Sequence, residues 1–204
     1  MKLGSVVLGF ALALMLALPA AAHTQQYSGT FAGLQESPPN ASPGSGSALV
    51  TVDFDLLTMR VQASFTGLIG NTTNAHIHCC LPGANGSLNV GVATQTPTFG
   101  GFPAGVTSGV YDNTFDMALS SSYNASFVTA AGGTVGGAFN ALVAGLDAGN
   151  AYFNIHTSSF PGGEIRAALA PVPEPESFAM LGAGLGLLAW RIRRRRGGSG
   201  RCSG

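Results

Sequence analysis

Basic side chains are almost absent from most of this sequence. Of the nine lysines and arginines in 204 residues, only Arg60 and Arg166 fall within residues 23–170, where they stand against seven carboxylates. This part of the chain therefore has a formal charge of −5. Proteins that bind nucleic acid neutralise phosphates with clustered lysine and arginine. The absence of such a cluster argues against nucleic acid as a partner.

The sequence also lacks the short motifs of several enzyme classes. It contains no Gly-x-Ser-x-Gly nucleophile turn, no phosphate-binding loop and no zinc-protease His-Glu-x-x-His helix. Combinations of serine, histidine and aspartate occur without a defining spacing. We therefore assign no catalytic residue from the sequence.

Convincing amphipathic helices are missing as well, and short runs with strand character take their place. Polar and apolar residues alternate within these runs, and turn-forming residues separate them, which is the pattern of half-buried strands. The runs cover residues 27–34, 48–54, 59–65, 74–78, 110–119, 138–143, 151–156 and 164–169. Residues 120–137 fit the pattern least and allow a short helix. The 148 residues from 23 to 170 are thus predicted to form one all-β domain, an antiparallel β-sandwich.

The first 22 residues have the features of a secretory signal peptide. Lys2 precedes an apolar run over residues 6–18, and Ala20-Ala21-Ala22 provides an Ala-x-Ala cleavage site. Signal peptidase would remove residues 1–22 and leave His23 as the new N-terminus. We therefore expect an exported protein.

Residues 171–196 contain a second targeting pattern. Pro173-Glu174-Pro175 precedes an apolar run over residues 178–190, and five arginines follow by residue 196. The order of these three parts resembles the PEP-CTERM sorting signal of Gram-negative bacteria. The resemblance implies transient anchoring in the inner membrane, cleavage by exosortase near Pro-Glu-Pro, and transfer to the cell surface or extracellular matrix.

A plain C-terminal transmembrane helix is the alternative for the same segment. Its apolar run is shorter than the roughly 20 residues of a stable membrane-spanning helix, so we favour the sorting signal. The tail at residues 197–204 is atypical of that signal.

Three of the four histidines lie in two similar stretches. His76 and His78 are two residues apart, so in a strand their side chains share one face. A shift of 78 residues aligns His78 with His156, and a Gly-Leu before and a Pro-Gly after the histidine recur in both stretches. This short repeat predicts two equivalent strand–turn units that point the three histidines at a common region.

Three converging imidazoles would suit a metal ion, with zinc, copper or manganese as candidates. Glu36 or Glu164 would add an oxygen ligand, and the nitrogens are expected roughly 3–4 Å apart around a tetrahedral centre. The alternative is that the histidines only hydrogen-bond to backbone and loop groups. Asn154 supports this alternative, since it takes the place of His76 in the second stretch and is a poor metal ligand.

The two glutamates also have a structural alternative, which we favour. Arg166 shares a strand face with Glu164, because the two residues are two positions apart. An ion pair of Arg166 with Glu164, or with Glu36 near the other end of the domain, would tie the first and last strands together.

Cys79 and Cys80 directly follow His78. In an exported protein, adjacent cysteines can close a vicinal disulfide, which we favour, or remain thiols beside the histidines and ligate the metal. The third cysteine, Cys202, is lost if the C-terminal segment is removed.

Three blocks of this sequence resemble the CHRD domain, which was named from chordin and occurs in exported bacterial proteins. The blocks are Gly33-Leu34-Gln35-Glu36-Ser37-Pro38-Pro39, Ala75-His76-Ile77-His78, and Asn154-Ile155-His156-Thr157 with Pro161-Gly162-Gly163-Glu164-Ile165-Arg166. They come in the family's order, and only Ser37 departs from the valine that is more common there. The resemblance implies a fold and a compartment, but the family has no settled biochemical activity.

We therefore expect an exported cell-surface or matrix module that is non-catalytic and binds extracellular polysaccharide or surface proteins. The alternative is a metal-binding redox enzyme that uses His76, His78 and His156, because the His-x-His strand loosely resembles that of copper/zinc superoxide dismutase. A third hypothesis is copper chelation by the amine and imidazole of His23 after cleavage.

Overall fold

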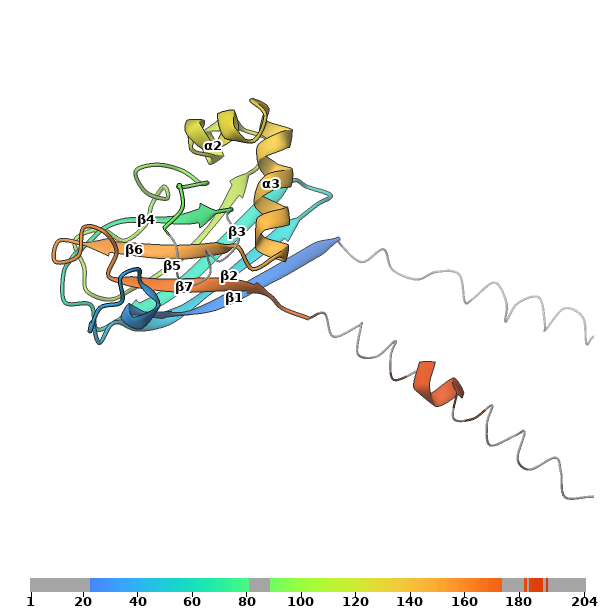
Figure 1. The fold of residues 1–204 in the computed structure, drawn as a ribbon, viewed down its shortest axis with the longest axis horizontal. Coiled ribbons are helices and arrows are strands. Elements are labelled where there is room, and N and C mark those ends of the chain that lie inside the picture. Colours follow the sequence, from blue (N-terminus) through green and yellow to red (C-terminus); the bar gives the residue numbers. More distant parts are fainter. Residues whose placement is uncertain (1–22, 81–88, 174–181, 183, 189, 191–204) are drawn as a thin grey trace, which may run out of the picture.

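The computed structural model describes residues 23–80, 89–173, 182, 184–188 and 190 (Figure 1). Its strands are β1 (Thr24–Ala32), β2 (Ser45–Asp53), β3 (Thr58–Thr66), β4 (Thr72–Cys79), β5 (Gly109–Asp116), β6 (Ala151–Thr157) and β7 (Ile165–Pro171). The α-helices are α2 (Ala125–Ala130) and α3 (Val135–Asp147), and the short 3-10 helices are η1 (Gly33–Gln35) and η2 (Ser120–Ser122).

The strands of the described residues form one antiparallel sheet in the order β4-β6-β7-β1-β2-β3-β5. The first and last strands, β1 and β7, are neighbours, so the two ends of the domain meet in the middle of the sheet. The sheet curls, and β1, β2 and β3 run at an angle to β4 and β6 in Figure 1. The predicted all-β antiparallel domain is confirmed. Its sandwich-like layers are two halves of one continuous sheet, one containing β1, β2 and β3 and the other containing β4 and β6.

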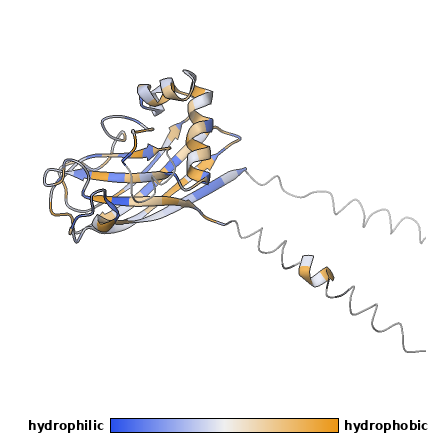
Figure 2. Cartoon of the chain, in the orientation of Figure 1, coloured by the Kyte–Doolittle hydropathy of each residue, from blue (hydrophilic) through white to orange (hydrophobic). Residues whose placement is uncertain are grey.

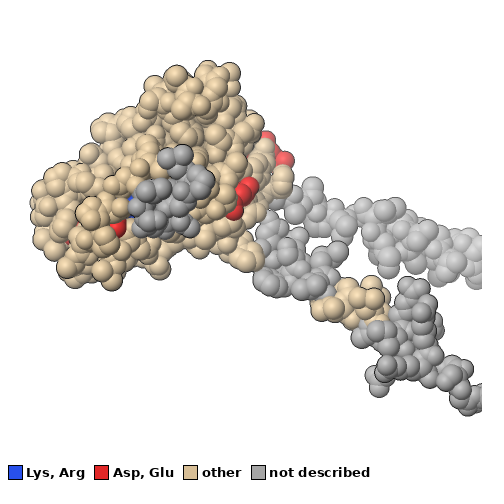
Figure 3. Space-filling model, in the orientation of Figure 1, with Lys and Arg blue, Asp and Glu red and all other residues tan. Residues whose placement is uncertain are grey.

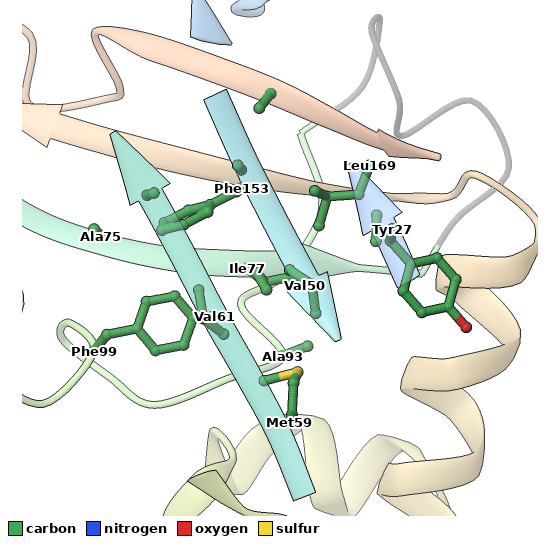
Figure 4. Packing of buried hydrophobic residues seen from close by; sticks show 14 of the residues in the cluster. Tyr27, Val50, Met59, Val61, Ala75, Ile77, Ala93, Phe99, Phe153 and Leu169 are labelled. Carbon is green, nitrogen blue, oxygen red and sulfur yellow. The ribbon is translucent and has the colours of Figure 1, made fainter. Parts of the chain in front are cut away.

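The core lies between these two halves. Every second side chain of β3 is buried, from Met59 to Phe65, and Figure 2 shows hydrophobic and hydrophilic residues alternating along β6. In Figure 4, Val50 and Val61 of one half lie near Ile77 of the other, and all three are fully buried. Burial of one such side chain stabilises the fold by about 1.5–3 kcal/mol.

Aromatic residues of the long loop after β4 close the open side of the sheet. The ring of Phe99 lies 5.2 Å from that of Phe115 in β5 and 5.4 Å from that of Phe153 in β6. The same loop covers the free edge of β4, because Phe99 N donates to Ala75 O and Ala93 N donates to Ile77 O. Strand β4 is thereby held at its outer edge as well as by β6.

The prediction of a strand at residues 138–143 was wrong, because these residues belong to α3. Thr134 caps the helix by accepting a hydrogen bond from Gly137 N at 3.0 Å. The buried residues Ala138, Leu142 and Leu146 are four apart and therefore form one helical stripe. The helix packs on β4, β6 and β7. The glycines at its first turn hid this period in the sequence.

The other seven predicted strands are present, with ends shifted by a few residues. The uncertain region at residues 120–137 contains η2, α2 and the start of α3, in line with the expected short helix. Residues 184–188 are helical, and within the described part of the chain no helix is long and apolar enough to cross a membrane. The predicted signal peptide, Glu174, Pro175, Cys202 and the tail at 197–204 lie outside the described residues.

Candidate metal centre

The two histidine-bearing stretches become the neighbouring antiparallel strands β4 and β6. Their register places His76 opposite Asn154, His78 opposite Tyr152 and Asn74 opposite His156. The repeat therefore has a local two-fold arrangement centred on the His76–Asn154 pair. His78 lies two residues beyond His76 on β4, and His156 lies two residues beyond Asn154 on β6, at the opposite end of the pair. All three imidazoles lie on the face of the sheet that points away from the core, since the residues between them, such as Ile77 and Ile155, are core residues.

The three imidazole rings come close together on this face. The ring centroid of His76 lies 4.7 Å from that of His78 and 4.8 Å from that of His156. One ligand nitrogen from each ring lies within 4.8 Å of the others. The predicted convergence of His76, His78 and His156 is thus a feature of the structure. Within the described chain, no cysteine or carboxylate belongs to this group.

A backbone carbonyl fixes the orientation of each ring. The Nδ1 atoms of His76, His78 and His156 lie 3.0, 2.6 and 2.8 Å from the carbonyl oxygens of Pro97, Val90 and Pro161. A carbonyl can only accept a hydrogen bond, so each Nδ1 carries the proton and donates it. In a neutral imidazole the other nitrogen, Nε2, then has a free lone pair. Carbonyls from two loops, Val90 and Pro97 in the loop after β4 and Pro161 in the loop after β6, therefore set the same tautomer in all three rings.

The Nε2 atoms of the three rings lie close together, and in this tautomer none of them carries a proton. Nε2 of His76 lies 3.0 Å from Nε2 of His156. Nε2 of His78 is buried and has no hydrogen-bond partner among the described residues. In a tetrahedral zinc site the nitrogens are about 3.3 Å apart, as follows from bonds of 2.0–2.1 Å. The first pair is near this value, and the three ligand nitrogens all lie within 4.8 Å of one another.

The imidazoles are neutral at pH 7. Burial lowers the pKa of His76 to about 4 and that of His78 to about 3, and the hydrogen bonds to the carbonyls of Pro97 and Val90 only partly oppose this shift. Burial also lowers the pKa of His156, with a contribution from Arg166. Neutral imidazole is the form that ligates metals.

Glu36 and Arg166 form a buried ion pair next to the histidines. Arg166 Nη2 lies 3.1 Å from Glu36 Oε2, and the two side chains are 1 % and 3 % exposed. Asn154 Nδ2 donates to both carboxylate oxygens of Glu36, at 3.0 and 3.1 Å. Burial raises the pKa of Glu36 although Arg166 and Asn154 oppose the shift. These contacts link the end of η1 to β6 and β7. They also engage the carboxylate of Glu36, which was a candidate metal ligand.

Glu164 has a different role from either of those predicted. Its buried carboxylate accepts hydrogen bonds from Ser42 Oγ, Ile69 N, Gly70 N and Thr157 Oγ1. Burial alone would raise the pKa of Glu164, but these four donors together lower it. Glu164 therefore fastens two loops and the end of β6 to the start of β7, while the ion pair of Arg166 is the one made with Glu36.

Tyr152 stands between the ion pair and the histidines. Its ring stacks on that of His78 at 4.6 Å and 12°, and Arg166 Cζ lies 3.9 Å from the centre of the same ring. Asn89 accepts from Arg166 Nη2 at 2.6 Å and donates to Ser37 O at 2.8 Å. Neither Tyr152 nor Asn89 was predicted. The alternation of Tyr152 with Asn154 and His156 along one strand face is the sequence signal that would have identified the tyrosine.

A family model of the CHRD domain matches residues 27–169. The chain belongs to the CHRD family. The three CHRD blocks of the sequence meet at this one site, since they supply Glu36, then His76 and His78, then Asn154, His156 and Arg166. Residues far apart in the chain are thus joined because β4, β6, β7 and β1 are successive strands of the sheet.

A second family model, the PEP-CTERM protein-sorting motif, matches residues 171–196 of this CHRD protein. The motif implies export and association with the surface of a Gram-negative bacterium, with processing by exosortase. No curated protein and no solved structure gave a significant match to the chain.

The cysteines of the CHRD domain lie on the other face of the sheet. Cys79 and Cys80 are joined as a vicinal disulfide. Cys79 is a core residue, and a Cβ added at Gly145 of α3 would collide with its sulfur. The sulfur atoms therefore pack against α3 and take no part in the histidine group. His23, the third proposed metal site, lies apart from that group as well, with its ring 4.8 Å from Phe54.

Proposed function

We propose that this CHRD domain is a non-catalytic module of the cell surface or extracellular matrix that holds one transition-metal ion with His76, His78 and His156. The observation that carries the proposal is the 3.0 Å approach of two Nε2 atoms in rings whose Nδ1 atoms both face backbone carbonyl oxygens. With the proton on Nδ1, neither Nε2 has one to donate. Two lone pairs at this distance repel each other unless a cation lies between or beside them. A bound metal ion removes this repulsion and uses the unpartnered Nε2 of His78 as well.

The supporting groups around the imidazoles agree with this proposal. Metal-binding histidines usually donate their second ring nitrogen to a carbonyl or carboxylate, which fixes the ring and its tautomer. His76, His78 and His156 each have such a carbonyl. Imidazole suits zinc and copper, whereas manganese prefers carboxylates and water. We therefore expect zinc or copper in preference to manganese.

Metal titration of the exported protein tests the proposal. After chelator treatment, the protein should bind one equivalent of Zn²⁺ or Cu²⁺ by calorimetry, and Mn²⁺ more weakly. His156→Ala and His78→Ala should each weaken binding by at least about tenfold, a typical effect of changes at a metal site. His23→Ala is the matched control, because it removes the one histidine outside the group and should leave affinity unchanged.

The outcomes separate this function from its alternatives. Equal binding by the unchanged protein and by His156→Ala would refute the site. If the histidines serve only to anchor loops, their removal lowers the unfolding midpoint equally with and without metal. Superoxide dismutation by the copper-loaded protein, lost in His156→Ala, would overturn the non-catalytic assignment in favour of a redox enzyme.

A further inference from the structure

We propose that the metal bound by His76, His78 and His156 takes its remaining ligand from outside the chain, and that this ligand is a single carboxylate group. The inference rests on the proposed metal centre. It concerns which molecule the centre recognises.

The described side chains leave a tetrahedral ion one ligand short. The group around the ion contains three histidines. Glu36 is held by Arg166 and Asn154, and Glu164 accepts from four donors of its own. Cys79 and Cys80 are bonded to each other on the opposite face. The adjoining segment 81–88, Leu-Pro-Gly-Ala-Asn-Gly-Ser-Leu, contains no histidine, cysteine, aspartate or glutamate.

The charge balance of the site favours an anion at the remaining position. Three neutral imidazoles leave the full charge of a divalent ion uncompensated, because no carboxylate is among its ligands. The nearby charges of Glu36 and Arg166 are committed to each other, so they add no net negative charge. A charge in a partly buried site is costly unless it is paired. An anionic ligand supplies that pairing directly, whereas a water molecule supplies it only by losing a proton.

The kind of anion follows from the rest of the domain. Carboxylate oxygens are regular zinc ligands at 2.0–2.2 Å, in sites that also contain histidine. Residues 23–170 have a formal charge of −5, and the face in Figure 3 shows scattered charges without a basic patch. A polyanion would be repelled by this surface along its length. One carboxylate group can still reach the centre from the side of His156, which is only partly buried.

Cobalt substitution tests this proposal with acetate as the probe. Co²⁺ replaces zinc in such sites and reports its own coordination through its visible absorption. The Co²⁺-loaded protein should show a saturable spectral change with acetate, and sulfate at the same ionic strength should not produce it. At an acetate concentration ten times its dissociation constant, the apparent affinity for Co²⁺ should rise about tenfold by linkage.

The possible results distinguish this proposal from the metal centre itself. Absence of a Co²⁺ spectrum that depends on His156 would refute the metal centre. A normal Co²⁺ spectrum that acetate leaves unchanged would refute only the carboxylate ligand. An equal response to sulfate and acetate would also overturn it, because the site would then accept any anion. His23→Ala serves as the control, since it leaves the three ligands and the buried ion pair in place and should preserve the acetate response.

Discussion

Glu36→Gln should destabilise the domain strongly, with or without a bound metal. The Glu36 and Arg166 side chains are 3 % and 1 % exposed, so the substitution leaves a guanidinium charge in a site that water barely reaches. Removal of one partner from such a pair costs about 3–5 kcal/mol. In a domain of this size, 1 kcal/mol corresponds to about 2–4 °C in Tm, so the expected loss is on the order of 10 °C.

Thermal unfolding of the metal-free protein, followed by far-ultraviolet circular dichroism, measures this loss. Asp112→Asn is the matched control, because it breaks the ion pair of Arg60 and Asp112, whose side chains are 52 % and 49 % exposed. Exposed pairs contribute little, so the control should leave Tm nearly unchanged. Combining Glu36→Gln with Arg166→Met should recover part of the loss by removing the unbalanced charge. Equal Tm values for Glu36→Gln and Asp112→Asn would refute the buried-pair argument.

Three further predictions concern the histidines, the disulfide and its helix. The pKa of His76 in the folded domain is lowered to about 4, so the unfolded chain takes up a proton at a higher pH than the folded domain does. The free energy of unfolding should therefore be largest above pH 6.5 and should fall by on the order of 3 kcal/mol as the pH is lowered toward 4. Between pH 6.5 and pH 4, the urea midpoint of the metal-free protein should fall more than the urea midpoint of the His76→Ala variant does. Alkylation of the exported protein without reduction should label neither Cys79 nor Cys80, and labelling of both would show free thiols. Gly145→Ala should destabilise the domain by about 1–3 kcal/mol through overpacking against the disulfide, whereas Gly136→Ala, where a Cβ meets open space, should not.

Alternation of side chains along single strands was enough to predict much of the site. It placed His76 and His78 on one face, and the repeat added His156. Glu36 and Glu164 were both considered as partners of Arg166, and the sequence could not decide between them. The choice depends on β1 lying beside β7, which brings η1 over the outer face, and such pairing over 130 residues is not encoded in local pattern.

Tyr152 and Asn89 were not identified from the sequence for the same reason, because their roles depend on contacts between distant parts of the chain. Tyr152 and Asn89 acquire their roles from strand register and from loop position, which are set by tertiary contacts. Helix α3 was missed for a different reason. Its Thr134 cap and its stripe of Ala138, Leu142 and Leu146 were present in the sequence, but two glycines in the first turn lowered its helical propensity. Packing on the sheet stabilises the helix despite them.

The ion pair and the histidine group depend on the fold in different ways. Glu36, Arg166 and Asn154 join η1, β7 and β6 with buried charge, so their loss weakens the sheet itself. Each histidine anchors one loop through Nδ1, but its Nε2 supports no part of the sheet. Binding or release of a metal therefore acts on the loops above the outer face and leaves the core between the two halves intact. Hydrogen exchange should accordingly show metal-dependent protection in the loops that carry Val90, Pro97 and Pro161, and unchanged protection in β2 and β3, whereas a metal effect spread over the whole sheet would contradict this separation.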